Sequence, residues 1–71
     1  MDMEYYNKEL AKNMRVERAR MNISQLRLAE IADVSLDTIN LIERGVGNPR
    51  FSTIISIANA LNVDLNTLLQ L

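Results

Sequence analysis

Three copies of one short pattern constrain the fold of this chain more than any other feature. In each copy an apolar residue precedes a Ser or Asp, and a second apolar residue follows that Ser or Asp by four positions. This is the spacing of a helix N-cap with a hydrophobic staple, in which the cap side chain accepts a hydrogen bond from a free backbone N–H. We therefore predict three helix starts. The residues are Ile23, Ser24 and Leu28, then Val34, Ser35 and Ile39, and finally Val63, Asp64 and Leu68.

The remaining pattern is helical as well, since glycine occurs twice, proline once, and strand-like alternation is absent from the sequence. Gly45 can take the left-handed conformation that ends a helix, and Pro49 marks the loop that follows. Only Asp33 and Val34 separate the second and third helices, and so short a connection requires the sharp crossing of a helix-turn-helix. The predicted fold class is all-α, one domain over residues 1–71, with five helices at about 5–20, 24–32, 35–44, 51–61 and 64–70.

The composition excludes several classes of protein. There is no cysteine and no histidine, which excludes a disulfide scaffold, a Cys/His zinc site and any catalytic dyad or triad that uses either residue. No apolar run approaches about 18 residues and the N-terminus lacks a signal-peptide core, so we expect a cytoplasmic protein. We expect no cofactor, no metal and no enzymatic activity, since the sequence has no Gly-rich phosphate loop and no carboxylate pair with metal spacing. A core of this size is marginal, which favours dimerisation.

The charges are unevenly distributed along the chain. The formal net charge is −1, which by itself argues against a nucleic-acid-binding protein. However, all eight Lys and Arg residues lie at or before position 50, whereas Asp64 is the one charged residue from 51 to 71. We therefore predict two surfaces with different partners. The apolar excess of the C-terminal third predicts a two-fold dimer interface, or else a docking site for a different protein. The residues assigned to the dimer are Ile55, Leu65, Leu69 and Leu71.

The third predicted helix has one face free for contacts. At about 100° per residue, Ile39 and Ile42 define its buried side. The opposite side carries two leucines beside its polar residues, and an exposed apolar pair of this kind suggests contact with another molecule. The residues of this outward face, in angular order, are Leu36, Asn40, Arg44, Asp37 and Leu41.

The central part of the chain carries a recognisable motif. The sequence ISQLRLAEIADVSLDTINLIERGVGNP, followed by IANALNV, resembles the helix-turn-helix family of the lambda repressor and Cro proteins, also called the xenobiotic-response-element (XRE) family. The resemblance covers about residues 10–69. Small members of this family that consist of the domain alone include Cro-like phage repressors and the controller proteins of restriction–modification operons. The resemblance implies a five-helix fold whose second and third helices read DNA.

The resemblance also implies roles for individual residues. Gln25 matches a glutamine that binds the DNA phosphate backbone and braces the recognition helix. Arg18 and Glu43 match a pair that forms an interior salt bridge between the first and third helices. The fourth and fifth helices supply the dimer contact in many small members. Six further residues match positions that face the major groove or its phosphates, namely Ser35, Leu36, Asp37, Asn40, Leu41 and Arg44. Apart from the resemblance, the predicted DNA contacts include Arg27 and Arg50, as cations that can reach phosphates, and Asn48.

Five positions depart from the family pattern. Asp33 replaces the usual turn glycine, although Asp tolerates the left-handed conformation better than most residues. Asn40 stands where a small residue is frequent, and Leu36, Asp37 and Leu41 stand where basic residues or glutamine are usual. These departures concern the strength and the sequence preference of DNA binding rather than the fold.

Each outward residue has a DNA-contact interpretation and a simpler one. Leu36 and Leu41 can contact thymine methyl groups, or they can pack on the second helix or a partner subunit. Asp37 can accept from a cytosine amino group, although the dipole at a helix start favours a carboxylate there in any case. Asn40 suits adenine, and Arg44 suits a phosphate, a guanine or the negative end of the helix dipole.

Two functions follow as hypotheses. The first is a sequence-specific double-stranded DNA-binding transcription regulator of the repressor or controller type, a homodimer on a palindromic operator that competes with RNA polymerase or recruits it. Its two recognition helices are then expected about 34 Å apart, one turn of DNA. The second is a protein-interaction module of the same fold, such as an antitoxin or an anti-repressor, which the low net charge and the outward leucines favour.

Overall fold

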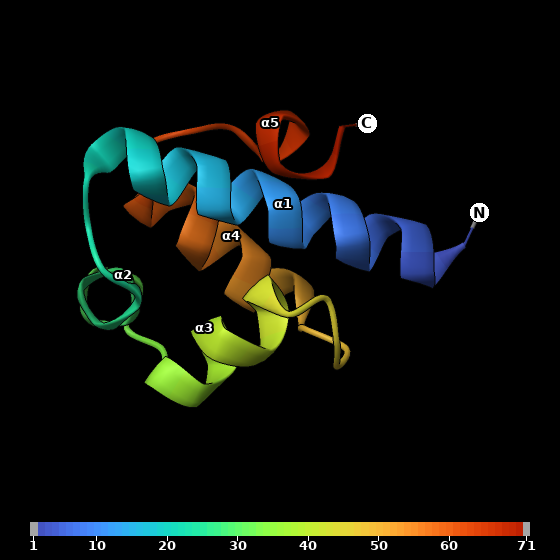
Figure 1. The fold of residues 1–71 in the computed structure, drawn as a ribbon, viewed down its shortest axis with the longest axis horizontal. Coiled ribbons are helices and arrows are strands. Elements are labelled where there is room, and N and C mark those ends of the chain that lie inside the picture. Colours follow the sequence, from blue (N-terminus) through green and yellow to red (C-terminus); the bar gives the residue numbers. More distant parts are fainter. Residues whose placement is uncertain (1, 71) are drawn as a thin grey trace.

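The computed structural model describes residues 2–70, which form five helices and no strand. The helices are α1 (Met3–Met21), α2 (Gln25–Ala32), α3 (Leu36–Glu43), α4 (Phe51–Ala60) and α5 (Leu65–Leu69). In Figure 1, α1 crosses the molecule with α5 on one side of it and α2 and α3 on the other. The all-α prediction and the five helices are confirmed, with bounds that differ from the expected ones by at most two residues. No helix in the described range is long and apolar enough to cross a membrane.

The three predicted helix caps are present. The side chains of Ser24, Ser35 and Asp64 each accept a hydrogen bond from the backbone N–H three residues later, at 3.0, 3.0 and 2.9 Å. A fourth cap explains why α1 begins earlier than expected, since Asp2 accepts from the N–H two residues later at 2.9 Å. Thr67 donates to Asp64 from its backbone N–H and from its hydroxyl, and these two hydrogen bonds hold the pKa of Asp64 below its usual value.

A residue in the left-handed conformation follows each of α2 and α3. Asp33 follows α2 with a φ of 58°, the conformation expected at the position of the missing turn glycine. Gly45 follows α3 with a φ of 74°. Its N–H donates to the carbonyl of Ile42 at 2.9 Å, and the N–H of Val46 donates to the carbonyl of Leu41 at 3.2 Å. This is the Schellman pattern, which supplies donors for two carbonyls at the end of α3.

The hydrophobic core draws on every helix. Its six largest fully buried side chains are Leu10, Met14, Leu28, Ile39, Ile57 and Leu68. The three apolar residues predicted to complete the staples are among them, so the local signals for helix starts also place core residues. Full burial of one such side chain stabilises a fold by roughly 1.5–3 kcal/mol. Helix α1 packs against α3 and α5, α2 packs against α3 and α4, and α4 packs against α5. Helix α3 is thus held by both α1 and α2.

One buried polar contact was not expected from the sequence. Asn13 on α1 is 9% exposed, and its Nδ2 donates to the backbone carbonyl of Leu68 at 2.8 Å. The last carbonyls of a helix have no intrahelical donor, so this bond satisfies a group that burial would otherwise leave unpaired. Because α5 has only five residues, the contact with Asn13 adds to the packing of the buried Leu68 in holding α5 in place.

Candidate nucleic-acid interface

The structure divides α3 into a buried and an exposed face. Ile39 is fully buried and Ile42 is 4% exposed, as the helical period predicted. Leu36 and Leu41 are 43% and 44% exposed. Packing within the monomer, the simpler interpretation of these two leucines, therefore leaves nearly half of each residue uncovered. The exposed residues of α3 and its C-cap include all five of the predicted outward face, namely Leu36, Asp37, Asn40, Leu41 and Arg44.

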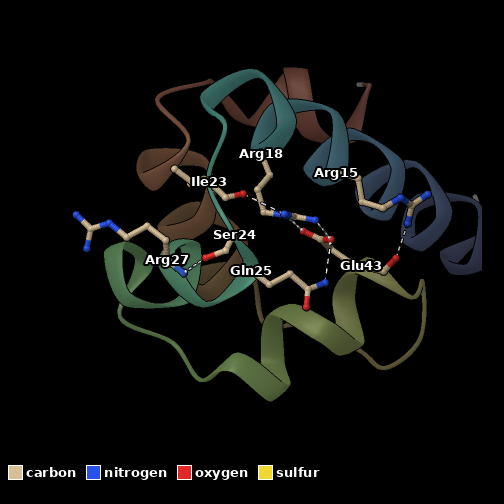
Figure 2. Close-up of polar contacts among 7 residues, drawn as sticks. All are labelled: Arg15, Arg18, Ile23, Ser24, Gln25, Arg27 and Glu43. Carbon is tan, nitrogen blue, oxygen red and sulfur yellow. Dashed lines mark hydrogen bonds and ion pairs between the residues drawn. The ribbon is translucent and has the colours of Figure 1, made fainter.

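The C-terminal end of α3 is anchored through the buried carboxylate of Glu43 (Figure 2), which is 5% exposed. Oε2 of Glu43 accepts from Nε of Arg18 at 2.9 Å, and Oε1 accepts from Nη2 of Arg18 at 3.1 Å. This bidentate geometry is the strong form of an Arg–carboxylate pair. Nε2 of Gln25 also donates to Oε1 of Glu43, at 3.1 Å. The ion pair implied by the family resemblance is therefore present, and α1, α2 and α3 meet at one carboxylate.

Two further hydrogen bonds near Glu43 are accepted by backbone carbonyls. Nη1 of Arg18 donates to the carbonyl of Ile23 at 3.0 Å, before the start of α2. Nη1 of Arg15 donates to the backbone carbonyl of Glu43. The second bond satisfies a carbonyl at the end of α3 and places a cation at the negative end of the helix dipole. No sequence pattern indicated this role for Arg15.

Gln25 has the bracing contact that the resemblance implied. It is the first residue of α2 and is half-buried. A carboxamide nitrogen carries two N–H donors, so the bond to Glu43 uses one and leaves the second for another acceptor. The amide oxygen of Gln25 points away from Glu43 (Figure 2). The side chain is thus held in one orientation at the start of α2.

Two other predicted DNA contacts have local partners. The hydroxyl of Ser35 caps α3 and lies 2.8 Å from the hydroxyl of Thr38. Arg27 is exposed on α2, points away from the Glu43 anchor (Figure 2) and lies 3.5 Å from the carboxylate of Glu30. Both residues remain at the surface, so their local bonds are compatible with a further contact.

A hollow of about 340 Å³ lies beside α3. Thr38 and Leu41 line it from α3, Asn48 and Arg50 line it from the loop, and Thr53 lines it from α4. The structure thus brings Leu41, Asn48 and Arg50 together from separate segments. A cation, an amide and hydroxyls around an apolar wall are the side-chain types that contact the sugar–phosphate backbone.

The predicted dimer residues differ in exposure. Ile55 on α4 is 39% exposed, whereas Leu65 and Leu69 are partly buried against the core of their own chain. Leu71 lies outside the described residues. Phe51, which the prediction omitted, is 61% exposed, the highest value among the large hydrophobic residues of the described chain. It precedes Ile55 by four positions and so shares its face of α4.

Three comparisons with known proteins bear on the family of this chain. A model of the helix-turn-helix family matches residues 12–68. Control protein C.SmaI from Serratia marcescens is 42% identical over 60 residues, which are 84% of this chain and 71% of that protein. The crystal structure of the hypothetical transcription factor NHTF from Neisseria matches with a TM-score of 0.88 and 32% identity, over 97% of this chain and 79% of that one. This chain therefore belongs to the helix-turn-helix family, of the XRE type that its sequence resembles, and is a DNA-binding transcription regulator.

Proposed function

We propose that this protein regulates transcription as a homodimer that binds a palindromic operator with α3 in the major groove. The observation that carries the proposal is the exposed face of α3 on a helix that is fixed at both ends. Ser35 caps the first turn, and Glu43 ties the last turn to Arg18 and Gln25. Such a helix presents its outward side chains from fixed backbone positions, and direct readout of base edges depends on those positions.

Base contacts fall to the outward side chains of α3. Asn40 is exposed and can form two hydrogen bonds with N6 and N7 of adenine. Arg44 is exposed at the C-cap and can reach a guanine or a phosphate. Leu36 and Leu41 suit thymine methyl groups, and their exposure leaves them available for that contact.

Phosphate contacts fall to side chains around α3. Gln25 offers a second N–H at the start of α2, where the helix dipole favours an anion. Asn48 and Arg50 border the hollow beside α3, and Arg27 is exposed on α2. Five of the eight basic residues pair with carboxylates within residues 2–70. Since log K falls with log salt by about 0.9 per neutralised phosphate, we expect a shallower salt dependence than that of a basic repressor.

The proposed dimer surface lies on the C-terminal helices, and its symmetry sets the spacing of the operator half-sites. Ile55 is exposed on α4, and Leu65 and Leu69 are partly buried on α5. A two-fold dimer through this surface is expected to present two copies of α3 about 34 Å apart, which corresponds to half-sites one DNA turn apart. The similar C.SmaI is named a control protein, which favours regulation of the controller type, by competition with RNA polymerase or by its recruitment.

Selection from a pool of randomised duplexes at low salt tests this proposal. We expect enrichment of a palindrome that binds one dimer, with the stoichiometry measured by sedimentation of the complex. The double variant Asn40→Ala/Arg44→Ala should lose operator binding and remain dimeric. Val16→Ala, an exposed substitution on α1, is the matched control. A pool in which no sequence is enriched would contradict the proposal.

The exposed leucines favour a second function, a protein-interaction module such as an antitoxin or an anti-repressor. Leu36 and Leu41 share the outward face of α3 with Asp37, and a carboxylate with two apolar side chains suits a protein surface better than a phosphate backbone. In that case the double variant Asn40→Ala/Arg44→Ala would leave the DNA affinity unchanged. Titration of a DNA duplex with the wild type and with this double variant therefore separates the two functions.

A further inference from the structure

A second hollow, of about 200 Å³, lies where the first turns of α1 meet the start of α4 and the end of α5. Its walls are mainly apolar and include Met3, Tyr6, Leu10, Ile54 and Leu69. Asn7 also lines it, but its Nδ2 donates to the carbonyl of Gly47 at 3.2 Å. The hollow is therefore suited to an apolar side chain rather than to a polar ligand.

Phe51 stands at the edge of this hollow. Pro49 and Ile54, which are close to it in sequence on either side, both line the hollow, whereas Phe51 does not. Phe51 is 61% exposed, so the hollow of its own chain does not cover its ring. An aromatic ring in water next to an apolar depression is an unfavourable surface for an isolated monomer.

We propose that Phe51 of a second copy of this chain fills the hollow, and that the exchange is reciprocal. In a two-fold dimer one patch contacts its own equivalent, so a projection and a hollow that adjoin each other on one surface can fill each other. Leu69 lines the hollow and is also one of the residues assigned to the dimer, and Ile55 lies one turn after Phe51. The inference rests on the homodimer of the proposed function and names its central contact.

The charges around the two features are complementary. Arg50 precedes Phe51, is exposed, and pairs with no carboxylate among residues 2–70. Asp2 and Glu4 are exposed and adjoin Met3, a lining residue of the hollow, in the sequence. Glu4 pairs with Lys8 at 3.4 Å, whereas Asp2 pairs with no cation among residues 2–70. With Phe51 in the partner's hollow, we expect Arg50 to lie near the partner's Asp2. This pattern selects a second copy of the chain over an acidic protein as the occupant.

The oligomeric state without DNA tests this contact separately from operator binding. Phe51→Ala should weaken the dimer by roughly 100-fold or more, because two symmetric aromatic contacts are lost. Val16→Ala removes a smaller exposed apolar group from α1 and should leave the dimer unchanged. Since Phe51 is exposed in the monomer, the variant should keep its helical circular dichroism, which is measured on the same samples.

A mixing experiment tests the reciprocity. Met3→Lys places a cation on the rim of the hollow, so its homodimer should be as weak as that of Phe51→Ala. In the mixture, Phe51 of the Met3→Lys chain can enter the unaltered hollow of the Phe51→Ala chain. We expect the heterodimer to be at least tenfold tighter than either homodimer, measured by sedimentation with one chain labelled.

The outcomes separate this inference from the proposed function. A Phe51→Ala protein that dimerises like the wild type, or a mixture with no preference for the heterodimer, would overturn the inference and leave operator binding standing. A wild-type chain that stays monomeric at millimolar concentration would also overturn it. A dimer that depends on Phe51 but enriches no duplex would support the contact and count against the proposed function.

Discussion

The two ends of α3 are held in different ways. At the C-terminal end, Glu43 is buried and accepts hydrogen bonds from Arg18 and Gln25, which lie on α1 and α2. At the N-terminal end, Asp37 is exposed, and the first turn is capped by Ser35, two residues before it. Contacts with α1 and α2 thus hold the C-terminal end of the helix, whereas a local cap holds its N-terminal end and leaves the Asp37 side chain free for other contacts. We expect substitutions at the two ends to separate stability from DNA binding.

The anchored end should have the largest effect on stability. Arg18→Ala leaves the Glu43 carboxylate, whose side chain is 3% exposed, with Gln25 as its one remaining side-chain donor in the described chain. Removing one partner of such a pair lowers the free energy of unfolding by roughly 3–5 kcal/mol. Urea denaturation followed by circular dichroism measures this. Glu43→Ala should cost less, since the Arg18 side chain is 23% exposed and can reach water. Equal losses for the two variants would contradict this asymmetry.

The same end of α3 shows how far the sequence predicts the structure. The caps and staples follow a local rule because their partners lie three to five residues apart, and the pair of Arg18 with Glu43 was implied by the family resemblance. The bond from Arg15 to the Glu43 carbonyl joins residues 28 positions apart, and the bond from Asn13 to Leu68 joins residues 55 positions apart. No spacing rule relates partners so distant, so only the packed structure identifies them.

The candidate site also has one part that the sequence predicts and one part that it does not. The outward face of α3 was predicted because the helical period alone determines which residues share a face. The two hollows were not, since each is formed by residues from more than one helix and from the loop between α3 and α4. Phe51 was omitted from the predicted dimer surface. The apolar residues of α4 form one continuous arc, in the order Ile57, Ile54, Ala58, Phe51 and Ile55, so periodicity does not distinguish the exposed ones from the buried ones.

The free face of α3 should affect DNA binding and leave stability unchanged. Asn40→Ala removes the carboxamide proposed to bond adenine, which should weaken operator binding by about 1–3 kcal/mol and relax the preference at one base pair. An exposed substitution of this kind should change the free energy of unfolding by no more than about 0.5 kcal/mol. Titration of the selected operator and of its single-base variants measures both effects on binding. A uniform loss over all variants would instead indicate that Asn40 contacts a phosphate.

Ser35 has a structural role and a proposed role in DNA binding, because it caps α3 and is also assigned to the DNA surface. Ser35→Ala removes the acceptor for the N–H of Thr38 and should cost about 1 kcal/mol of stability. Ser35→Asp keeps a capping acceptor and adds a negative charge, so it should retain stability while weakening operator binding. Thermal unfolding and operator titration of both variants separate the two roles. Unchanged binding by Ser35→Asp would remove Ser35 from the proposed DNA surface.

Asp37 decides how the beginning of α3 meets DNA, and its effect on stability should be smaller than that of Arg18. Asp37→Asn keeps the shape of the side chain and changes the formal net charge from −1 to 0. The lost interaction with the helix dipole should cost about 0.3–1 kcal/mol of stability. If the carboxylate faces phosphates, the affinity for the operator should rise at low salt, because a repulsion is removed. If it accepts from a cytosine amino group, the affinity should fall, with the loss confined to that base pair. An affinity that does not change would mean that the first turn of α3 lies away from the groove, and the exposed Leu36 beside Asp37 would then be left for a protein contact.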